Sequence, residues 1–306
     1  MKCGRVNLFI GEPNVGKSNI LEALALFAFP LTGDLNGLVR FNDLSNLFFD
    51  NTLDAPITIS GYPNGSCSIN YDTLYDGVKF YFENKEGQKL TQLFKLSEFK
   101  GGGDIDFNVR PYFFKTLKRF EKKRPGFLHP PHGENLFTVL QTNAKLRDLI
   151  SSFLDSLGYK LNFRPSTSEL ELAKVTSRSF TTIPFHAISD TIQRLIFFLS
   201  AIESNPKGAT LIFEEPESNI FPYYTKFLAE KMALTEHQQF FISTHNPIFL
   251  QSVIEKTKQS DLTIYLVETI QGGYETKASL LNESAVEEIL NLGVDVFLNF
   301  DHLLSE

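Results

Sequence analysis

The distribution of hydrophobic and polar positions divides the chain into stretches of different character. The first opens with a short apolar run at residues 5–10, which predicts a buried strand, followed by a glycine-containing loop and a helical pattern over 17–30. From about 56 to 110, short alternating or aromatic runs are separated by pairs such as Asn-Gly and Asp-Gly. Because these pairs favour tight hairpin turns, this stretch predicts an antiparallel β subdomain.

The rest of the chain combines helical and strand patterns. Helices are expected at 111–124 and 134–157, on either side of a Pro/Gly-rich break, and a hairpin at 159–175. Helices and strands then alternate, with helices at about 188–204, 221–234, 247–258 and 283–291 and strands at 209–213, 239–243 and 262–267. This alternation predicts an α/β fold with a mostly parallel sheet, together with the antiparallel β subdomain and a helical insertion.

The length of 306 residues leaves room for one large domain or two modest ones. We expect one composite domain built from four segments. They are the glycine loop with its strand and helix at 1–55, the β subdomain at 56–110, a helical and basic insertion at 111–180, and the alternating part at 181–306.

The composition indicates a packed protein of a reducing compartment. Hydrophobic residues make up 42% of the chain, and with 30 Phe and no Trp, Phe must fill most of the aromatic core. No apolar run approaches the roughly 20 residues of a membrane-spanning helix, and no secretory signal is evident. The two cysteines, Cys3 and Cys67, have no metal-ligand spacing. We therefore expect a cytoplasmic protein without membrane contact.

Charge is distributed unevenly along the sequence. The net charge is −7, which argues against a protein that coats nucleic acid with a uniformly basic surface. Residues 110–124, however, hold seven basic residues and one acidic residue in the run RPYFFKTLKRFEKKR. Two interpretations remain open: a solvated helix face, or a patch that contacts DNA phosphates or an acidic partner.

The glycine loop fits the phosphate-loop pattern G-x-x-x-x-G-K-[ST], read as GEPNVGKS. Its glycines allow backbone N–H groups to surround a β-phosphate at the start of a helix. Lys17 is expected to bridge the β- and γ-phosphates, and the Ser18 hydroxyl to bind Mg²⁺. The predicted nucleotide-binding residues here are Gly11, Glu12, Pro13, Asn14, Val15, Gly16, Lys17, Ser18 and Asn19.

Two later strands end in residues that suit phosphate chemistry. The strand in ATLIFEEPE runs into Glu214, placed to hold a Mg²⁺-bound water, and Glu215, placed to polarise an attacking water. The strand in FISTHNP delivers His245, which could hydrogen-bond a γ-phosphate. Since ligands bind at the carboxyl ends of strands in open α/β sheets, we expect these ends to converge with the phosphate loop.

The order of GEPNVGKSNILEAL, SDTIQR, LIFEEPE and STHNP resembles ATP-binding-cassette-type AAA ATPases, in the branch of RecF, SMC and OLD proteins. The resemblance implies a P-loop NTPase fold of ABC type, with ATP and Mg²⁺ as cofactors and ATP sandwiched between two heads in a homodimer or larger homo-oligomer. It further implies that Ser189 and Asp190, in a signature loop followed by Arg194, contact the γ-phosphate bound to the other subunit. Ser218 and Asn219 would lie near the dimer interface.

The sequence departs from this pattern at several points. Glu214 stands where Asp is usual, which predicts altered Mg²⁺ binding and slow turnover, and Thr191 replaces the signature glycine. A glutamine loop has two candidates, Gln141 and Gln193. Only ten residues precede Gly11, so we expect either a start upstream of the given one or a trimmed sheet edge that weakens base specificity. Neither a long coiled coil nor a nuclease module is evident.

Two functions fit these features. The first is a Mg²⁺-dependent ATPase with Lys17, Glu215 and His245 as catalytic residues, which couples turnover to DNA or to a partner protein. The second is an ATP-sensing switch or scaffold subunit, for example of a phage-defence system, that holds a separate effector with little turnover. A small-molecule kinase lacks a recognisable acceptor site, and a GTPase would need an Asn-Lys-x-Asp motif, which is absent.

Overall fold

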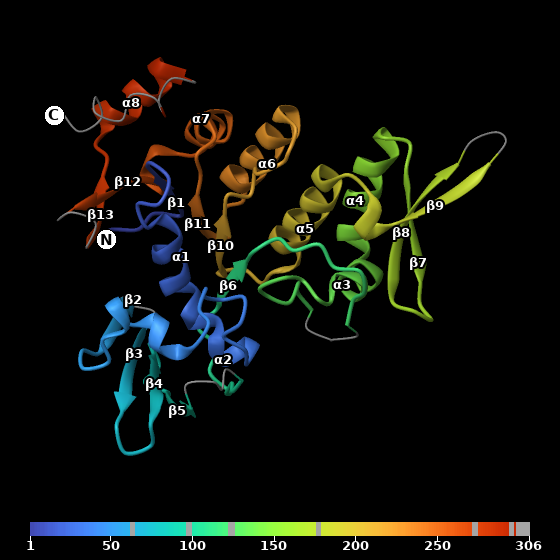
Figure 1. The fold of residues 1–306 in the computed structure, drawn as a ribbon. Coiled ribbons are helices and arrows are strands. Elements are labelled where there is room, and N and C mark those ends of the chain that lie inside the picture. Colours follow the sequence, from blue (N-terminus) through green and yellow to red (C-terminus); the bar gives the residue numbers. More distant parts are fainter. Residues whose placement is uncertain are drawn as a thin grey trace. The chain divides into compact units, whose positions relative to one another are not determined.

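The computed structural model describes residues 1–61, 65–95, 100–121, 126–175, 179–270, 275–293 and 297 (Figure 1). The chain forms two compact units. Unit 1 contains Met1–Lys17 and Tyr112–Glu306, and unit 2 contains Ser18–Pro111. The first boundary between the units therefore falls directly after the lysine of the glycine loop.

A six-stranded sheet organises unit 1. Its strands, in spatial order, are β13 (Glu275–Leu280), β12 (Leu262–Ile270), β1 (Val6–Ile10), β11 (Gln239–Ser243), β10 (Thr210–Glu214) and β6 (Val109–Tyr112), within which the chain passes from unit 2 to unit 1. β1 is parallel to β11 and β12, and β10 is parallel to β11, whereas β13 is antiparallel to β12. The predicted mostly parallel sheet is confirmed.

The register of this sheet brings strand ends together. Ser243, the last residue of β11, lies opposite Phe9 of β1 on one side and opposite Glu214 of β10 on the other. Because these strands are parallel, the segments that follow them leave from the same edge. The expected convergence of the glycine loop with the two later strand ends is thus a property of the register.

The central strands β1, β10 and β11 of this sheet are buried on both faces, as the strands of parallel sheets usually are. One face of β1 carries Val6, Leu8 and Ile10 into the main hydrophobic cluster. Helices α5 (Asp190–Ser204), α6 (Pro222–Leu234) and α7 (Pro247–Lys256) supply Phe198, Leu228 and Phe249 to the same cluster. On the other face, the ring of Phe9 stacks between those of Phe241 and Tyr265, with centroid distances of 6.3 and 5.5 Å.

The middle of the chain adds two helices and a small sheet to unit 1. α3 (Leu136–Thr142) and α4 (Ala144–Ser156) replace the single predicted helix, because Asn143 interrupts it and caps α4 by accepting from the Leu146 N–H at 3.0 Å. The predicted hairpin is confirmed as β7 (Lys160–Arg164) and β8 (Glu169–Val175). A third strand, β9 (Phe180–Pro184), pairs with β8 and was not predicted. The final helix is α8 (Glu283–Leu292).

The helix predicted at 111–124 is wrong for the part that the structure describes. The chain completes β6 at Tyr112, and residues 113–121 form neither helix nor strand. Tertiary contacts explain this path: the Phe113 N–H donates to the Pro131 carbonyl at 3.0 Å, and the Phe114 ring meets the Phe197 ring edge-on at 5.6 Å. Residues 122–125 lie outside the described residues.

Unit 2 combines a broken helix with an antiparallel sheet. The helix predicted over 17–30 is shorter, since α1 covers Lys17–Ala25 and gives way to a 3-10 turn at Leu26–Ala28 and a short α2 at Phe29–Thr32. The sheet has the simple order β2 (Ile57–Gly61), β3 (Gly65–Asp72), β4 (Gly77–Asn84) and β5 (Lys89–Lys95). Its antiparallel pairing matches the prediction from the hairpin turns.

Within the described ranges, no helix combines the length and the apolar character that a membrane-crossing segment requires.

Phe29 is the centre of the aromatic core of unit 2. Its ring lies 5.8, 6.0 and 5.6 Å from the rings of Phe80, Phe82 and Phe94, respectively. We expect Phe29→Ala to lower the free energy of unfolding by about 3–5 kcal/mol, because it leaves a cavity among packed rings. Leu74→Ala is the control, since Leu74 is 90% exposed. Urea denaturation measures both, and an equal effect of the two changes would contradict this assignment of the core.

Candidate functional site

The glycine loop leaves β1 with a backbone that needs its glycines. Gly11 has φ +147° and Gly16 has φ +97°, and at each position a Cβ atom would come within 2.3 Å of another atom: the Val267 carbonyl oxygen or Thr276 Oγ1, respectively. Asn14 adopts a left-handed conformation with φ 63°. The Thr276 hydroxyl also donates to the Val15 carbonyl at 3.2 Å, which joins the loop to the edge strand β13.

Lys17 closes the loop from inside. Its Nζ donates to the carbonyls of Gly11 and Glu12 at 2.8 and 2.6 Å, and the residue is 8% exposed. Burial lowers the pKa of Lys17, and the carboxylates of Glu215 and Glu12 oppose this lowering. Both carboxylates therefore favour the charged form of Lys17.

The other predicted loop residues differ in exposure. Glu12, Pro13 and Asn14 are exposed, as is Asn19 on α1. Ser18 is half-buried and is the second residue of α1 and the first of unit 2.

Glu215 has a strained backbone at the end of β10. The strand ends at the half-buried Glu214, and Glu215 then takes φ +42°, a left-handed value that is uncommon for a residue with a side chain. Its N–H donates to the Ser243 carbonyl at 3.0 Å and lies 3.3 Å from Ser243 Oγ. This turn directs the Glu215 carboxylate towards the segment that follows β11.

His245 meets Glu215 at this edge. Its Nδ1 lies 3.0 Å from Glu215 Oε1, and both side chains keep solvent access, with 58% and 38% of their surface exposed. Directly after it, Asn246 caps α7 by accepting from the Phe249 N–H at 3.0 Å, and Pro247 occupies the first turn. The structure therefore brings together two of the residues that the sequence predicted as catalytic.

Glu217 was missed by the sequence analysis. Its carboxyl group is 3% exposed and accepts from the Thr244 hydroxyl at 2.6 Å. Burial raises its pKa to about 7, partly offset by the hydrogen bond from Thr244 and by His245. Its position two residues after Glu215 was the one feature of the sequence that could have identified it. The sequence alone, however, does not show which acidic residue of such a run is buried.

The predicted signature residues start α5. Ser189 occupies the N-cap position, although its side chain makes no capping hydrogen bond. Asp190 Oδ2 instead pairs with Arg194 Nε at 2.8 Å, and the Arg194 guanidinium lies 4.6 Å from the centre of the Phe114 ring. Thr191, in the place of the signature glycine, donates its hydroxyl to the Asn219 carbonyl at 3.0 Å. This contact ties the start of α5, the predicted signature loop, to the turn that follows Glu215.

The two candidates for a glutamine loop lie in different environments, one buried and one exposed. Gln193 is 3% exposed and donates to the Ile188 carbonyl at 2.8 Å, so it supports the start of α5 from within. Gln141 is exposed on α3.

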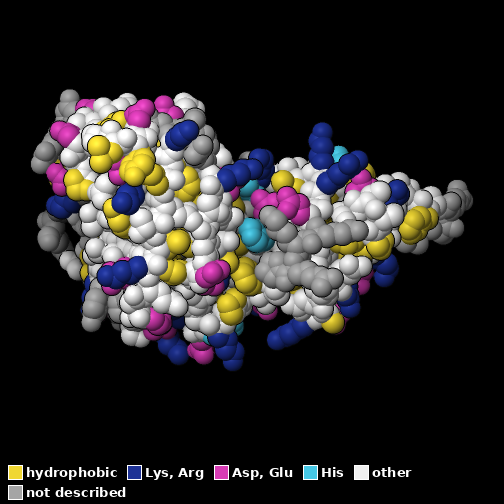
Figure 2. All heavy atoms as spheres, turned by 90° about the horizontal axis from the view of Figure 1, so that it is seen from below, with side chains coloured by type: hydrophobic (Ala, Val, Ile, Leu, Met, Phe, Trp, Pro, Cys, Tyr) yellow, Lys and Arg dark blue, Asp and Glu magenta, His cyan; other side chains and the backbone are white. Residues whose placement is uncertain are grey.

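The basic stretch is only partly a surface feature. Arg110 is 1% exposed and forms a two-pronged ion pair with Asp106 at 2.6 and 2.8 Å, so it is not available to a partner. Lys115, Lys118 and Arg119 are exposed. Lys122, Lys123 and Arg124 lie outside the described residues. On the face seen in Figure 2, basic side chains are spread among acidic ones instead of gathering in one patch.

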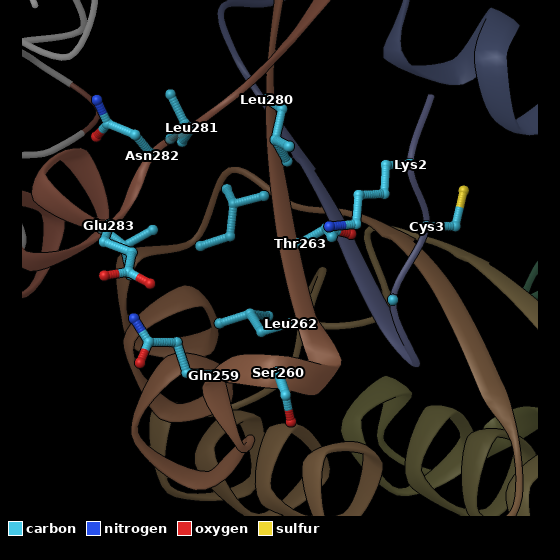
Figure 3. A pocket seen from close by; sticks show the side chains of 13 residues that line it. Lys2, Cys3, Gln259, Ser260, Leu262, Thr263, Leu280, Leu281, Asn282 and Glu283 are labelled. Carbon is cyan, nitrogen blue, oxygen red and sulfur yellow. The ribbon is translucent and has the colours of Figure 1, made fainter.

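A pocket of about 260 Å³ opens at the end of the large sheet opposite to the candidate site (Figure 3). Lys2 and Gly4 precede β1, Leu262 and Thr263 begin β12, and Leu280 ends the antiparallel β13. The pocket therefore lies at the amino ends of the parallel strands and contains none of the predicted site residues. In the part of the chain that the structure describes, no group of three or more His, Cys, Asp or Glu residues could hold a metal ion.

Comparisons with known proteins bear on the family and the fold. Residues 105–251 match the family described as "AAA domain, putative AbiEii toxin, Type IV TA system". The fold is similar to an SMC head solved with the C-terminal winged-helix domain of ScpA, at 14% identity and a TM-score of 0.50, over 93% of this chain and 92% of that one. An SMC head domain from Thermotoga maritima gives 14% identity and a TM-score of 0.40, over 91% and 90% of the two chains. No curated protein matched the sequence.

The buried carboxyl of Glu217 predicts a pH dependence of stability. Its ordinary pKa is 4.5 and its folded pKa is about 7, so between these values the folded state holds a proton that the unfolded chain has lost. The free energy of unfolding therefore falls as pH rises through this window, by at most roughly 1.4 kcal/mol per pH unit from this group.

We expect Glu217→Gln to remove that contribution, because an amide has no proton to lose. Urea denaturation between pH 5 and pH 8 should show the variant gaining stability relative to the natural protein as pH rises. The exposed Glu236→Gln is the matched control. Parallel stability curves for Glu217→Gln and the natural protein would contradict the assignment.

Proposed function

We propose that this chain is an ABC-type AAA ATPase of the SMC/RecF-like branch, which binds Mg²⁺–ATP at the phosphate loop and hydrolyses it at Glu215; the match of residues 105–251 to an AAA family and the fold support this. A second copy of the chain completes the site. The observation that carries the proposal is the contact between Glu215 Oε1 and His245 Nδ1 at 3.0 Å, at the edge from which the phosphate loop also leaves.

Each group at this edge suits one part of the reaction. The Lys17 ammonium, which donates to the carbonyls of Gly11 and Glu12, would instead pair with β- and γ-phosphate oxygens when ATP is bound. The Glu215 carboxylate accepts a hydrogen bond from the attacking water and draws its proton away as the oxygen approaches the γ-phosphorus. His245, held against Glu215, donates to a γ-phosphate oxygen and stabilises the charge that develops there.

The residues at the site also fit a magnesium ion. The Ser18 hydroxyl and the Glu214 carboxylate are the hard oxygen ligands that Mg²⁺ prefers, and the remaining ligands would come from water and the phosphates. Bound there, the ion would neutralise charge on the β- and γ-phosphates.

The second copy would contribute Ser189 and Asp190. Both precede the main body of α5, whose positive N-terminal end favours an anion such as the γ-phosphate of a facing subunit. The hydrogen bond from Thr191 to the Asn219 carbonyl supports this role, since it holds the signature loop beside the Ser218–Asn219 turn of the same chain. A homodimer built this way would bury both segments around ATP.

A switch with little turnover is the second candidate function. The observation that favours it is Glu214, whose carboxylate extends one methylene further than the usual Asp and would displace the Mg²⁺-bound water. In that case ATP occupancy would hold two heads together for a partner effector, and the slow hydrolysis step would set the lifetime of the complex.

Glu215→Gln separates these functions. If the first is correct, the substitution should reduce Mg²⁺-dependent ATP hydrolysis by about 100-fold or more, because the amide cannot take a proton. It should also accumulate an ATP-bound dimer, detected by light scattering after size exclusion. Glu236→Gln is the matched control on an exposed glutamate. A natural protein that binds ATP but shows no hydrolysis, even with DNA and partner present, would leave only the switch.

DNA contact through the basic stretch is a further part of the proposal. Lys118→Glu with Arg119→Glu should weaken binding to duplex DNA at least about tenfold at moderate salt and reduce the salt dependence, because two phosphate contacts are lost. Basal hydrolysis should not change.

The control for this experiment is Lys85→Glu with Lys89→Glu, which changes charge equally at two exposed lysines of unit 2. Fluorescence anisotropy with labelled DNA at several salt concentrations measures the effect. If the natural protein and the Lys118/Arg119 variant bind DNA equally well, these two residues are solvated surface residues that do not contact DNA.

A further inference from the structure

A buried hydrogen bond connects the segments that follow β10 and β11. The carboxyl group of Glu217, two residues after Glu215, accepts from the Thr244 hydroxyl at 2.6 Å, and Thr244 directly precedes His245. Glu217 is 3% exposed and Thr244 is fully buried. The bond therefore lies beneath the exposed Glu215–His245 contact, inside the protein, and water does not compete for it.

Thr244 is held from three directions. Its hydroxyl donates to Glu217 and accepts from the Asn246 N–H at 3.1 Å, and its own N–H donates to the Phe9 carbonyl of β1 at 3.1 Å. Asn246 in turn caps α7. His245 thus lies between two residues whose positions are fixed, and the Thr244 hydroxyl is the atom that links both of them to the Glu215 turn.

This arrangement carries a cost in stability. A carboxyl group without a cationic partner is buried only at the expense of its hydration. Glu217 Oε2 is among the buried oxygens that have no hydrogen-bond partner within the described residues. An apolar side chain would avoid this cost but could not accept from Thr244. The benefit of Glu217 must therefore come from the geometry that it imposes.

We propose that Glu217 and Thr244 are positioning residues that hold His245 within hydrogen-bond distance of Glu215 and keep the strained Glu215 turn in place. The proposal deepens the proposed function and rests on it for the catalytic consequence. Its structural consequence, the fixed backbone around His245, does not depend on hydrolysis and can be measured separately.

The structural consequence is measured by hydrogen–deuterium exchange of the full chain without nucleotide. Thr244→Val keeps the shape of the side chain but removes the hydroxyl, so the amides of residues 244–246 should exchange about tenfold faster. Thr244→Ser should restore the natural rate. Thr235→Val is the matched control: Thr235 is also buried, and its hydroxyl also donates a hydrogen bond, to the Lys231 carbonyl at 2.7 Å. It should leave these amides unchanged.

The catalytic consequence is measured by steady-state ATP hydrolysis. Thr244→Val should lower kcat about tenfold and leave the KM for ATP within about twofold, because it misplaces His245 without touching the phosphate loop. Thr244→Ser should recover kcat. Glu217→Ala should resemble Thr244→Val, and the double variant should be no worse than either single one, since both remove the same hydrogen bond.

The outcomes distinguish the two proposals. Unchanged exchange at residues 244–246 in Thr244→Val overturns the positioning role, whatever the ATPase result. Faster exchange with an unchanged kcat also overturns the positioning role, because the Glu217–Thr244 hydrogen bond would then fix the backbone without affecting catalysis. If the natural protein does not hydrolyse ATP, the ATPase function fails while the exchange experiment still decides whether the Glu217–Thr244 bond fixes His245.

Discussion

The hydrogen bond from the Glu215 N–H to the Ser243 carbonyl is the contact on which the candidate site depends. It extends the pairing of β10 with β11 by one residue past the end of β10, and it holds Glu215 in a left-handed conformation that a free chain would avoid. From this point the carboxylate reaches His245, and the chain turns back to bury Glu217 against Thr244. If the two strands were shifted by one residue, each of these side chains would point to the other side of the sheet.

The rest of unit 1 serves to keep that register. Apolar residues on β1 and on helices α5, α6 and α7 form one cluster, and the Phe9, Phe241 and Tyr265 rings stack across three neighbouring strands on the opposite face. A sheet packed on both faces tolerates little sliding, because every strand would have to leave its side-chain neighbours. The glycine loop adds a second constraint, since a Cβ atom at Gly11 or Gly16 would collide with β12 or β13.

Much of the fold followed from local patterns. Most elements of the alternating part were predicted to within a few residues because their apolar runs are bounded by clear turn signals, and the β2–β5 sheet was indicated by its hairpin turns. The errors lie where tertiary contacts overrule propensity. The run after Tyr112 has a helical composition, but Phe113 and Phe114 are held by Pro131 and Phe197 in an irregular path. β9 and β13 were not predicted either. Each is an edge strand that pairs with a single neighbouring strand.

By itself, the sequence determined which chemical groups are available: a glycine loop with Lys17, an acidic end to one strand and a histidine at the end of another are all local signals. Only the tertiary structure decided which of these groups meet. It paired Glu215 with His245, tied Thr191 to Asn219, and removed Arg110 from the basic surface by burying it against Asp106. It also revealed Glu217, because burial depends on residues distant in the chain, and burial is what turns an ordinary acidic residue into an internal hydrogen-bond acceptor.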